Sequence, residues 1–275
     1  ERYLHQMEPV ILYLSTVYRR RENTQAAFFC YFLAQHRILR QMPMDEIQHI
    51  VISFMEKDSL YCRVNALKAL CAFGSAETVV DTLLRCDGQS GFLHAKVLVE
   101  TLLSFGGDAR ELIRLIWSRF SRFSVPMQRA LLDYIRFKSG DYGVQMLDIL
   151  LDRRRDKELR LAAIRYFGRY PSPEAQAALL GFIQDPDPAQ WEYAAISASA
   201  LASYPDAEVT AALANATHSA NWYVRYNAAA SLERRRLSYE DLIVHIGGND
   251  RYAREMLTYQ MESRKLKEEK ELAGV

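Results

Sequence analysis

Carboxylates and histidines are the side chains that could carry acid–base or metal chemistry in this sequence. Asp45 and His49 are one helical turn apart, which is the spacing of an ordinary surface pair. Glu100 and Asp133 occupy matching positions of two repeated segments, and paired carboxylates can act as general acid and base. Isolated surface charges are a far commoner origin of such a match. The sequence has no Gly-rich phosphate loop, HExxH or GxSxG motif. We therefore expect a protein that is not an enzyme, with no catalytic residue, no metal site and no cofactor.

Aromatic and charged side chains at matching positions of the same segments could instead bind a partner. Tyr193 and Tyr226 are equivalent, and Lys96 and Arg129 hold the same place in earlier segments. Tyr and Arg contribute much of the binding energy at protein interfaces. The predicted partner-binding residues are Lys68, Lys96, Glu100, Arg129, Asp133, Arg165, Tyr193 and Tyr226. We interpret the neighbouring tryptophans as packing between segments.

The elements that position these residues form a repeat. Equivalent positions recur at intervals of 32, 33, 32, 32 and 33 residues, at Arg63, Ala95, Gln128, Arg160, Glu192 and Arg225. Three, four and seven residues after each of them stands an apolar residue, with Ser199 as the one exception. Offsets of three, four and seven mark one side of an α-helix. The pattern therefore predicts six equivalent helices, which we call the B helices.

Each B helix is followed by a break and another helix, which we call an A helix. Breaks such as Gly106-Gly107-Asp108 and Tyr204-Pro205-Asp206 contain the Gly, Pro and Asp that are typical of helix ends. The A helices are expected near Thr78–Leu84, Ala109–Trp117, Val144–Leu151, Ala175–Ile183, Ala207–Ala214 and Tyr239–His245. We find no reliable alternation of β-branched residues that would indicate a strand, so the chain is expected to be all-α.

The two ends of the chain are predicted to cap the row of repeats. Residues 1–22 have apolar side chains at helical spacing, 25–34 are apolar nearly all round and should be buried, and 45–55 form a third helix. Residues 262–271 are almost wholly charged. We expect one solenoid domain over 1–275. It has N-terminal capping helices at 1–57, repeats of 32–33 residues at 58–249, and a C-terminal capping helix and charged tail at 250–275.

The composition is that of a soluble, ordered chain with 275 residues, 49% hydrophobic residues and a formal net charge of +1. The charge argues against nucleic acid as a partner, because dedicated nucleic-acid binders usually have a basic excess. No apolar run approaches the roughly 20 residues that span a bilayer. Four cysteines without CxxC spacing favour buried, reduced thiols and a cytoplasmic location, with a disulfide or metal set as the alternative. Because the sequence begins at Glu1, an upstream membrane anchor is a further hypothesis.

Three segments resemble the HEAT repeat, in which an Asp-rich turn precedes a helix with Val-Arg and spaced Ala and Leu. They are Arg63-Val64-Asn65-Ala66-Leu67-Lys68-Ala69-Leu70 after Asp58, Arg160-Leu161-Ala162-Ala163-Ile164 after Asp156, and Val224-Arg225 with Ala228-Ala229 after Asn221. The resemblance covers residues 25–259, although 92–105 and 125–137 lack the Val-Arg pair. It implies a right-handed α-α superhelix of stacked HEAT-like helical hairpins, with the B helices on the concave face. It also implies that Arg63, Arg160 and Arg225 are structural, each bonded to the turn before its helix.

The resemblance fixes an architecture and leaves the function open. Our first hypothesis is a non-enzymatic scaffold or adaptor that binds a protein or peptide segment along the concave face. It could be the cytosolic part of a membrane-anchored protein. The alternative is a nucleic-acid-binding protein, because some HEAT-like proteins resemble DNA glycosylases of alkylated bases. A third option is an enzyme that attaches a chromophore, because bilin lyases also use HEAT-like repeats, but no residue here selects it.

Overall fold

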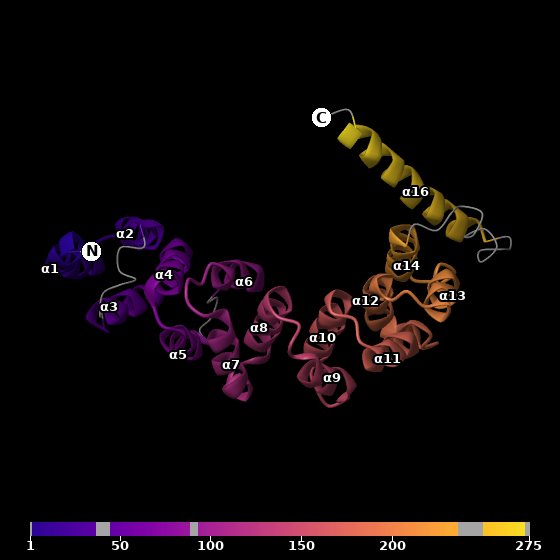
Figure 1. Ribbon diagram of the computed structural model, residues 1–275, viewed down its shortest axis with the longest axis horizontal. Coiled ribbons are helices and arrows are strands. Elements are labelled where there is room, and N and C mark those ends of the chain that lie inside the picture. Colours follow the sequence, from indigo (N-terminus) through magenta and orange to yellow (C-terminus); the bar gives the residue numbers. More distant parts are fainter. Residues whose placement is uncertain (1, 37–44, 89–92, 236–249, 273–275) are drawn as a thin grey trace. The chain divides into compact units, whose positions relative to one another are not determined.

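The chain forms two compact units, residues 1–139 and 140–275, in a computed structural model that describes residues 2–36, 45–88, 93–235 and 250–272. Over these residues there are fifteen α-helices and no strand (Figure 1). The prediction of an all-α chain is therefore confirmed.

The first unit contains four helical hairpins in two rows. Its helices are α1 (Arg2–Arg19), α2 (Asn23–His36), α3 (Asp45–Met55), α4 (Leu60–Phe73), α5 (Ala76–Cys86), α6 (Ala95–Leu103), α7 (Ala109–Ser118) and α8 (Val125–Lys138). The A helices α1, α3, α5 and α7 pack in sequence on one another, and the B helices α2, α4, α6 and α8 do the same. The row of B helices thus begins one hairpin earlier than the repeat pattern predicted.

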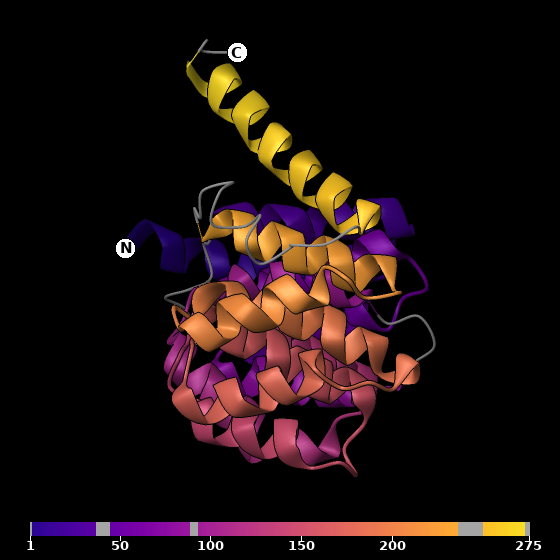
Figure 2. The ribbon, with the colours of Figure 1, turned by 90° about the vertical axis from the view of Figure 1, so that its right-hand side faces the viewer.

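The second unit continues the same alternation. Its helices are α9 (Gly143–Leu151), α10 (Lys157–Arg169), α11 (Pro173–Ile183), α12 (Trp191–Ala200), α13 (Ala207–Ala216), α14 (Trp222–Arg234) and α16 (Arg251–Leu272). The A row is α9, α11 and α13, and the B row is α10, α12 and α14. The last helix, α16, packs against α14 (Figure 2), and Ala253 and Leu257 are its buried apolar residues. The A helix expected at Tyr239–His245 lies outside the described residues.

Polar side chains in the turns fix where the B helices begin. Ser59 caps α4, Ser124 caps α8 and Asp156 caps α10, each by accepting a hydrogen bond from a backbone N–H of the first turn. Such caps satisfy N–H groups that have no partner inside the helix. The observed starts therefore follow from the Ser and Asp positions in the sequence.

The apolar stripe that defined the repeat forms the B-helix side of the core in both units. At the offset of three residues, Ala66, Leu98, Leu131, Ala163, Ala195 and Ala228 are all buried. Ile196 and Ser199 on α12 are only partly buried, and Ser199 is the position that already departed from the pattern. Since each helix buries this stripe against its neighbours in the row, the stacked hairpins form an all-α solenoid. The handedness of a superhelix and the single domain stay predictions.

Two expectations about the first unit need comment. The prediction that α2 is buried all round was wrong, because Phe28 and Tyr31 are 64% and 48% exposed. The buried side of α2 is formed by Ala26, Phe29 and Leu33. All four cysteines are buried and free, and burial raises the pKa of Cys71 to about 12 and that of Cys86 to about 11.

Candidate functional site

The arginines near the starts of the B helices bond to backbone carbonyls that precede their own helices. Arg63 Nη1 donates to the Lys57 carbonyl at 3.3 Å, and Arg225 Nη1 donates to the Ser219 carbonyl at 2.7 Å. Arg160 Nε donates to the Leu150 carbonyl at 3.0 Å. Arg63 and Arg225 thus stabilise the turn before their own helix, whereas Arg160 joins α10 to the last turn of α9. In each case the positive charge of the guanidinium is used in a hydrogen bond within the fold.

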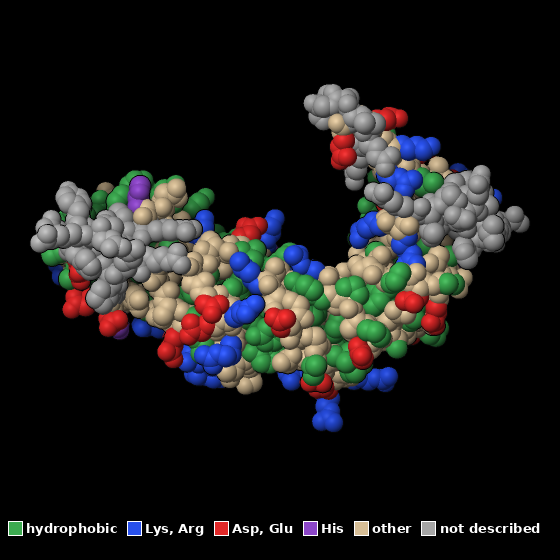
Figure 3. All heavy atoms as spheres, viewed as in Figure 1, with side chains coloured by type: hydrophobic (Ala, Val, Ile, Leu, Met, Phe, Trp, Pro, Cys, Tyr) green, Lys and Arg blue, Asp and Glu red, His purple; other side chains and the backbone are tan. Residues whose placement is uncertain are grey.

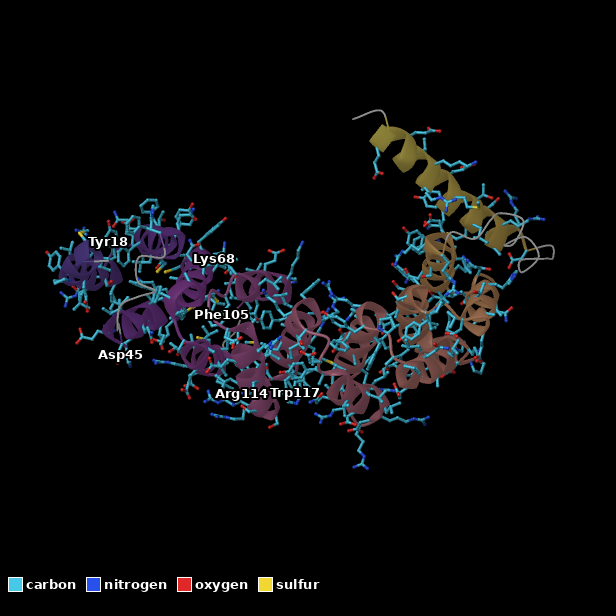
Figure 4. All side chains as sticks on the ribbon, viewed as in Figure 1. Tyr18, Asp45, Lys68, Phe105, Arg114 and Trp117 are labelled. Atoms are coloured by element: carbon cyan, nitrogen blue, oxygen red, sulfur yellow. The ribbon has the colours of Figure 1, made fainter. Side chains whose placement is uncertain are left out.

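In the first unit, the predicted binding residues lie along the B row α4, α6 and α8. Lys68 on α4 is exposed, whereas Arg114 and Trp117 lie on the A helix α7 (Figure 4). Lys96 Nζ lies 3.9 Å from Glu100 Oε1 on α6, and both side chains are exposed.

On α8, Asp133 Oδ1 pairs with Arg136 Nη2 at 3.1 Å, and Arg129 is partly buried. Glu100 and Asp133 are therefore each paired with a cation of their own helix. Neither ion pair brings Glu100 and Asp133 together, as a general acid and base would require.

Tyr193 does not lie on an open face, which corrects the expected side-by-side register with Tyr226. Its side chain is only 7% exposed and stacks on Phe182 of α11, with ring centroids 5.1 Å apart. The Arg160 guanidinium lies 4.9 Å from the centre of its ring and donates to its hydroxyl at 3.2 Å. Tyr193 thus packs within the second unit, where Arg165 is also partly buried.

Tyr226 belongs to a different cluster, in which Trp191 packs between repeats as expected but Trp222 is half exposed. Trp191 stacks on Tyr223 at 5.3 Å, Trp222 meets Tyr223 edge-on at 5.2 Å, and Trp222 stacks on Tyr226 at 5.0 Å. We call Trp191, Tyr223, Trp222 and Tyr226 the aromatic ladder. It joins the first turns of α12 and α14, and Trp222 and Tyr223 are 50% and 56% exposed.

The local sequence explains why these rings are outside the core. Asn221 accepts hydrogen bonds from the N–H groups of Tyr223 and Val224, so α14 begins at Trp222. In the first turn only Val224 faces the apolar stripe, and it is buried. Consecutive aromatic residues directly after an Asn cap were the signal in the sequence that could have identified the ladder.

A hollow of about 710 Å³ lies beside the ladder in the second unit. It is lined by the turn between α11 and α12, the turn between α13 and α14, and Trp191. His218 Nδ1 and Asp250 Oδ2 are 2.8 Å apart, and the hydrogen bond with His218 holds the pKa of Asp250 below its usual range. This pair connects the start of α16 to the turn between α13 and α14.

The remaining candidates for chemistry have ordinary surroundings. His49 Nδ1 bonds to the backbone carbonyl of Asp45 at 2.6 Å, so the contact does not involve the Asp45 carboxylate. Among the described residues, no group of three or more His, Cys, Asp or Glu side chains could hold a metal ion. None of the described helices combines the length and the apolar character that crossing a membrane requires.

The fold and these contacts define the class of protein as an α-solenoid of helical hairpins with an exposed aromatic cluster on its B helices. Residues 145–233 match the family model of HEAT repeats. The resemblance seen in the sequence is thereby confirmed over the stretch from α9 to α14. No curated protein matches the chain. HEAT repeats commonly serve as protein-interaction scaffolds.

Proposed function

We propose that this protein is a non-enzymatic interaction scaffold or adaptor that binds a segment of a protein partner on the faces formed by its B helices. The observation that carries the proposal is the aromatic ladder. Its rings contact one another by stacking or edge-on, yet Trp222 and Tyr223 keep about half of their surface in contact with solvent. Trp and Tyr are the residues most enriched among those that dominate binding energy.

The ladder is suited to a partner because it is fixed before binding. Trp222 and Tyr226 are one helical turn apart on α14, and Trp191 on α12 supports Tyr223 from the neighbouring repeat. Stacked rings of this kind present a large apolar surface at a small cost in conformational entropy. In the second unit, the partly buried Tyr226 and Arg165 are further proposed binding residues. On the B row of the first unit, the proposed binding residues are Lys68, Lys96, Glu100, Arg129 and Asp133.

The proposed location is the cytoplasm, in a free protein or in the cytosolic part of a membrane-anchored one. The four free, buried cysteines support it, because thiols stay reduced in that compartment. The proposal concerns location alone and is separate from partner binding.

Photo-crosslinking tests the proposed binding surface directly. Benzoylphenylalanine replaces Trp222 in one variant and Val144 in another, since Val144 is 74% exposed on the A helix α9 of the same unit. After crosslinking in cells, mass spectrometry identifies the captured peptides. We expect position 222 to capture one recurring segment of a partner that position 144 does not. Equal capture from both positions would remove the aromatic ladder as the binding surface.

A further inference from the structure

The hollow beside the aromatic ladder has the size of a binding site. Its volume of about 710 Å³ lies within the range of roughly 300–1,000 Å³ that is usual for ligand pockets. Ile183, Ala194, Ala212 and Val224 contribute apolar surface to it, and the polar groups come from the two turns and the end of α13. An occupant would therefore meet apolar walls and a polar rim.

Two carboxylates stand on that rim in fixed positions. Asp185 Oδ1 accepts a hydrogen bond from the Asp187 N–H at 2.9 Å, and Asp187 Oδ1 accepts one from the Ala189 N–H at 2.9 Å. Each carboxylate is thus oriented by one oxygen while its side chain stays exposed. Within the described parts of the chain, neither Asp185 nor Asp187 forms an ion pair, so both keep their negative charge available for an occupant.

The other groups around the hollow favour the same kind of occupant. The Trp191 side chain lines the hollow and also stacks on Tyr223, which makes the aromatic ladder continuous with it. An indole face attracts a cation held over it. Asn215 adds a side-chain amide, and His218 on the far turn is already paired with Asp250.

We propose that this hollow binds the Arg or Lys side chain of a protein partner, while the partner's adjacent residues lie on the aromatic ladder. Charge complementarity decides the occupant, because a cationic side chain pairs with Asp185 and Asp187 and contacts Trp191 at once. A phosphate or an acidic segment would be repelled by the same carboxylates. The inference rests on the proposed function and specifies the chemistry of the partner.

The test uses a neutral variant of the rim and a matched control. Asp185→Asn/Asp187→Asn removes both charges and keeps the side-chain oxygens that accept the turn hydrogen bonds, so the turn is retained. Glu174→Gln/Glu208→Gln makes the same change of charge at two exposed residues of α11 and α13 that do not line the hollow. Thermal unfolding compares the stability of the two variants before binding is measured.

The probe is the synthetic peptide acetyl-Gly-Arg-Gly-Arg-Gly-amide, with citrulline in place of Arg as the neutral reference. Nuclear magnetic resonance follows the indole N–H signals of the three tryptophans during titration, with Trp191→Phe assigning one of them. We expect the Arg peptide to shift the Trp191 signal. We expect the affinity to fall about tenfold in the Asn variant, because it loses two exposed ion pairs with the peptide.

The Gln control should bind within about twofold of the wild type, since neither Glu174 nor Glu208 lines the hollow and exposed charges are screened by salt. Equal affinity of the Asn variant, or equal binding of the citrulline peptide, would overturn the inference. If the wild type self-associates and the Asn variant does not, the result supports the cation site and identifies a second copy of this chain as the partner.

The crosslinking at position 222 separates this inference from the proposed function. If position 222 captures the same partner segment in the wild type and in the Asn variant, and the Arg peptide does not discriminate between them, the scaffold stands and the cation site fails. If the Arg peptide prefers the wild type but position 222 captures no recurring segment, the hollow binds cations and the proposed function fails.

Discussion

The hydrogen bonds of Arg235 stabilise the fold and are all made within the protein. Its guanidinium donates to the backbone carbonyls of Tyr204, Pro205 and Asp206 and to Thr210 Oγ1. Partial burial holds its pKa below the ordinary value. The side chain therefore connects the end of α14 to the turn that begins α13.

Replacing Arg235 with Leu should destabilise the second unit by about 2 kcal/mol, because hydrogen bonds from a charged group are worth roughly 1.5–3 kcal/mol. Arg234→Leu is the control, since Arg234 is the exposed neighbour on the same helix. Urea unfolding followed by circular dichroism measures both variants. The assignment fails if the two substitutions lower the free energy of unfolding by the same amount.

Ionisation of Tyr166 should lower the stability of the folded protein at alkaline pH. Burial raises the pKa of Tyr166 to about 12, and its hydroxyl accepts a hydrogen bond from the Tyr142 N–H at 3.1 Å. In the unfolded chain the pKa is about 10. The folded state therefore holds this proton more tightly, and the resulting stability is fully present below pH of about 10 and is lost as pH rises towards about 12.

The free energy of unfolding should therefore fall over this pH interval, and less steeply in Tyr166→Phe than in the wild type. Tyr252→Phe changes an exposed tyrosine of the same unit and should leave the slope unaltered. Urea titrations at a series of pH values give the slopes. An identical slope in the wild type and in Tyr166→Phe would show that Tyr166 ionises alike in both states.

At the scale of elements, the close approach of α10 and α12 depends on Gly168. A Cβ atom at this position would lie 3.0 Å from Ala200 Cα and 3.1 Å from Ala200 Cβ. Gly181 on α11 is also helical, but a Cβ atom there would have no neighbour within 4 Å. A substitution at Gly181 therefore changes helix propensity alone, whereas a substitution at Gly168 also changes the packing between α10 and α12.

Gly168→Val should destabilise the protein by roughly 1–3 kcal/mol, because overpacking forces the two B helices apart. Gly181→Val should change the stability little, and Gly181→Ala should raise it by roughly 0.5–1 kcal/mol. Thermal and urea unfolding provide the comparison. Equal effects of Val at both positions would contradict the close packing of α10 on α12.

The helices were largely predictable from the sequence, and the surroundings of the candidate binding residues were not. Periodicity identified the B helices because the offsets of three, four and seven residues report burial directly. The roles of exposed positions depend on which neighbour lies across the row. Tyr193 and Tyr226 are equivalent in sequence, but the first packs on Phe182 and the second on Trp222. The difference arises because α11 places Phe182 against Tyr193, whereas the cap of α14 places Trp222 one turn before Tyr226.

For the whole molecule, the charge distribution supports a protein partner better than a nucleic acid. The chain has 35 basic and 34 acidic residues, and on the face seen in Figure 3 both signs are interspersed over the described surface. Arg160 and Arg225 of the second unit are bonded to carbonyls. A nucleic-acid interface instead needs basic groups gathered on one surface.

The most direct test of the account is the affinity of the crosslinked partner segment for variants of the aromatic ladder, measured by isothermal titration calorimetry. Trp222→Ala/Tyr226→Ala should weaken binding at least about tenfold, because aromatic residues that dominate interfaces contribute about 2 kcal/mol or more each. Tyr252→Ala/Tyr259→Ala, at two exposed tyrosines of α16, is the matched control and should bind like the wild type. If both double variants bind with the affinity of the wild type, the aromatic ladder is not the binding surface.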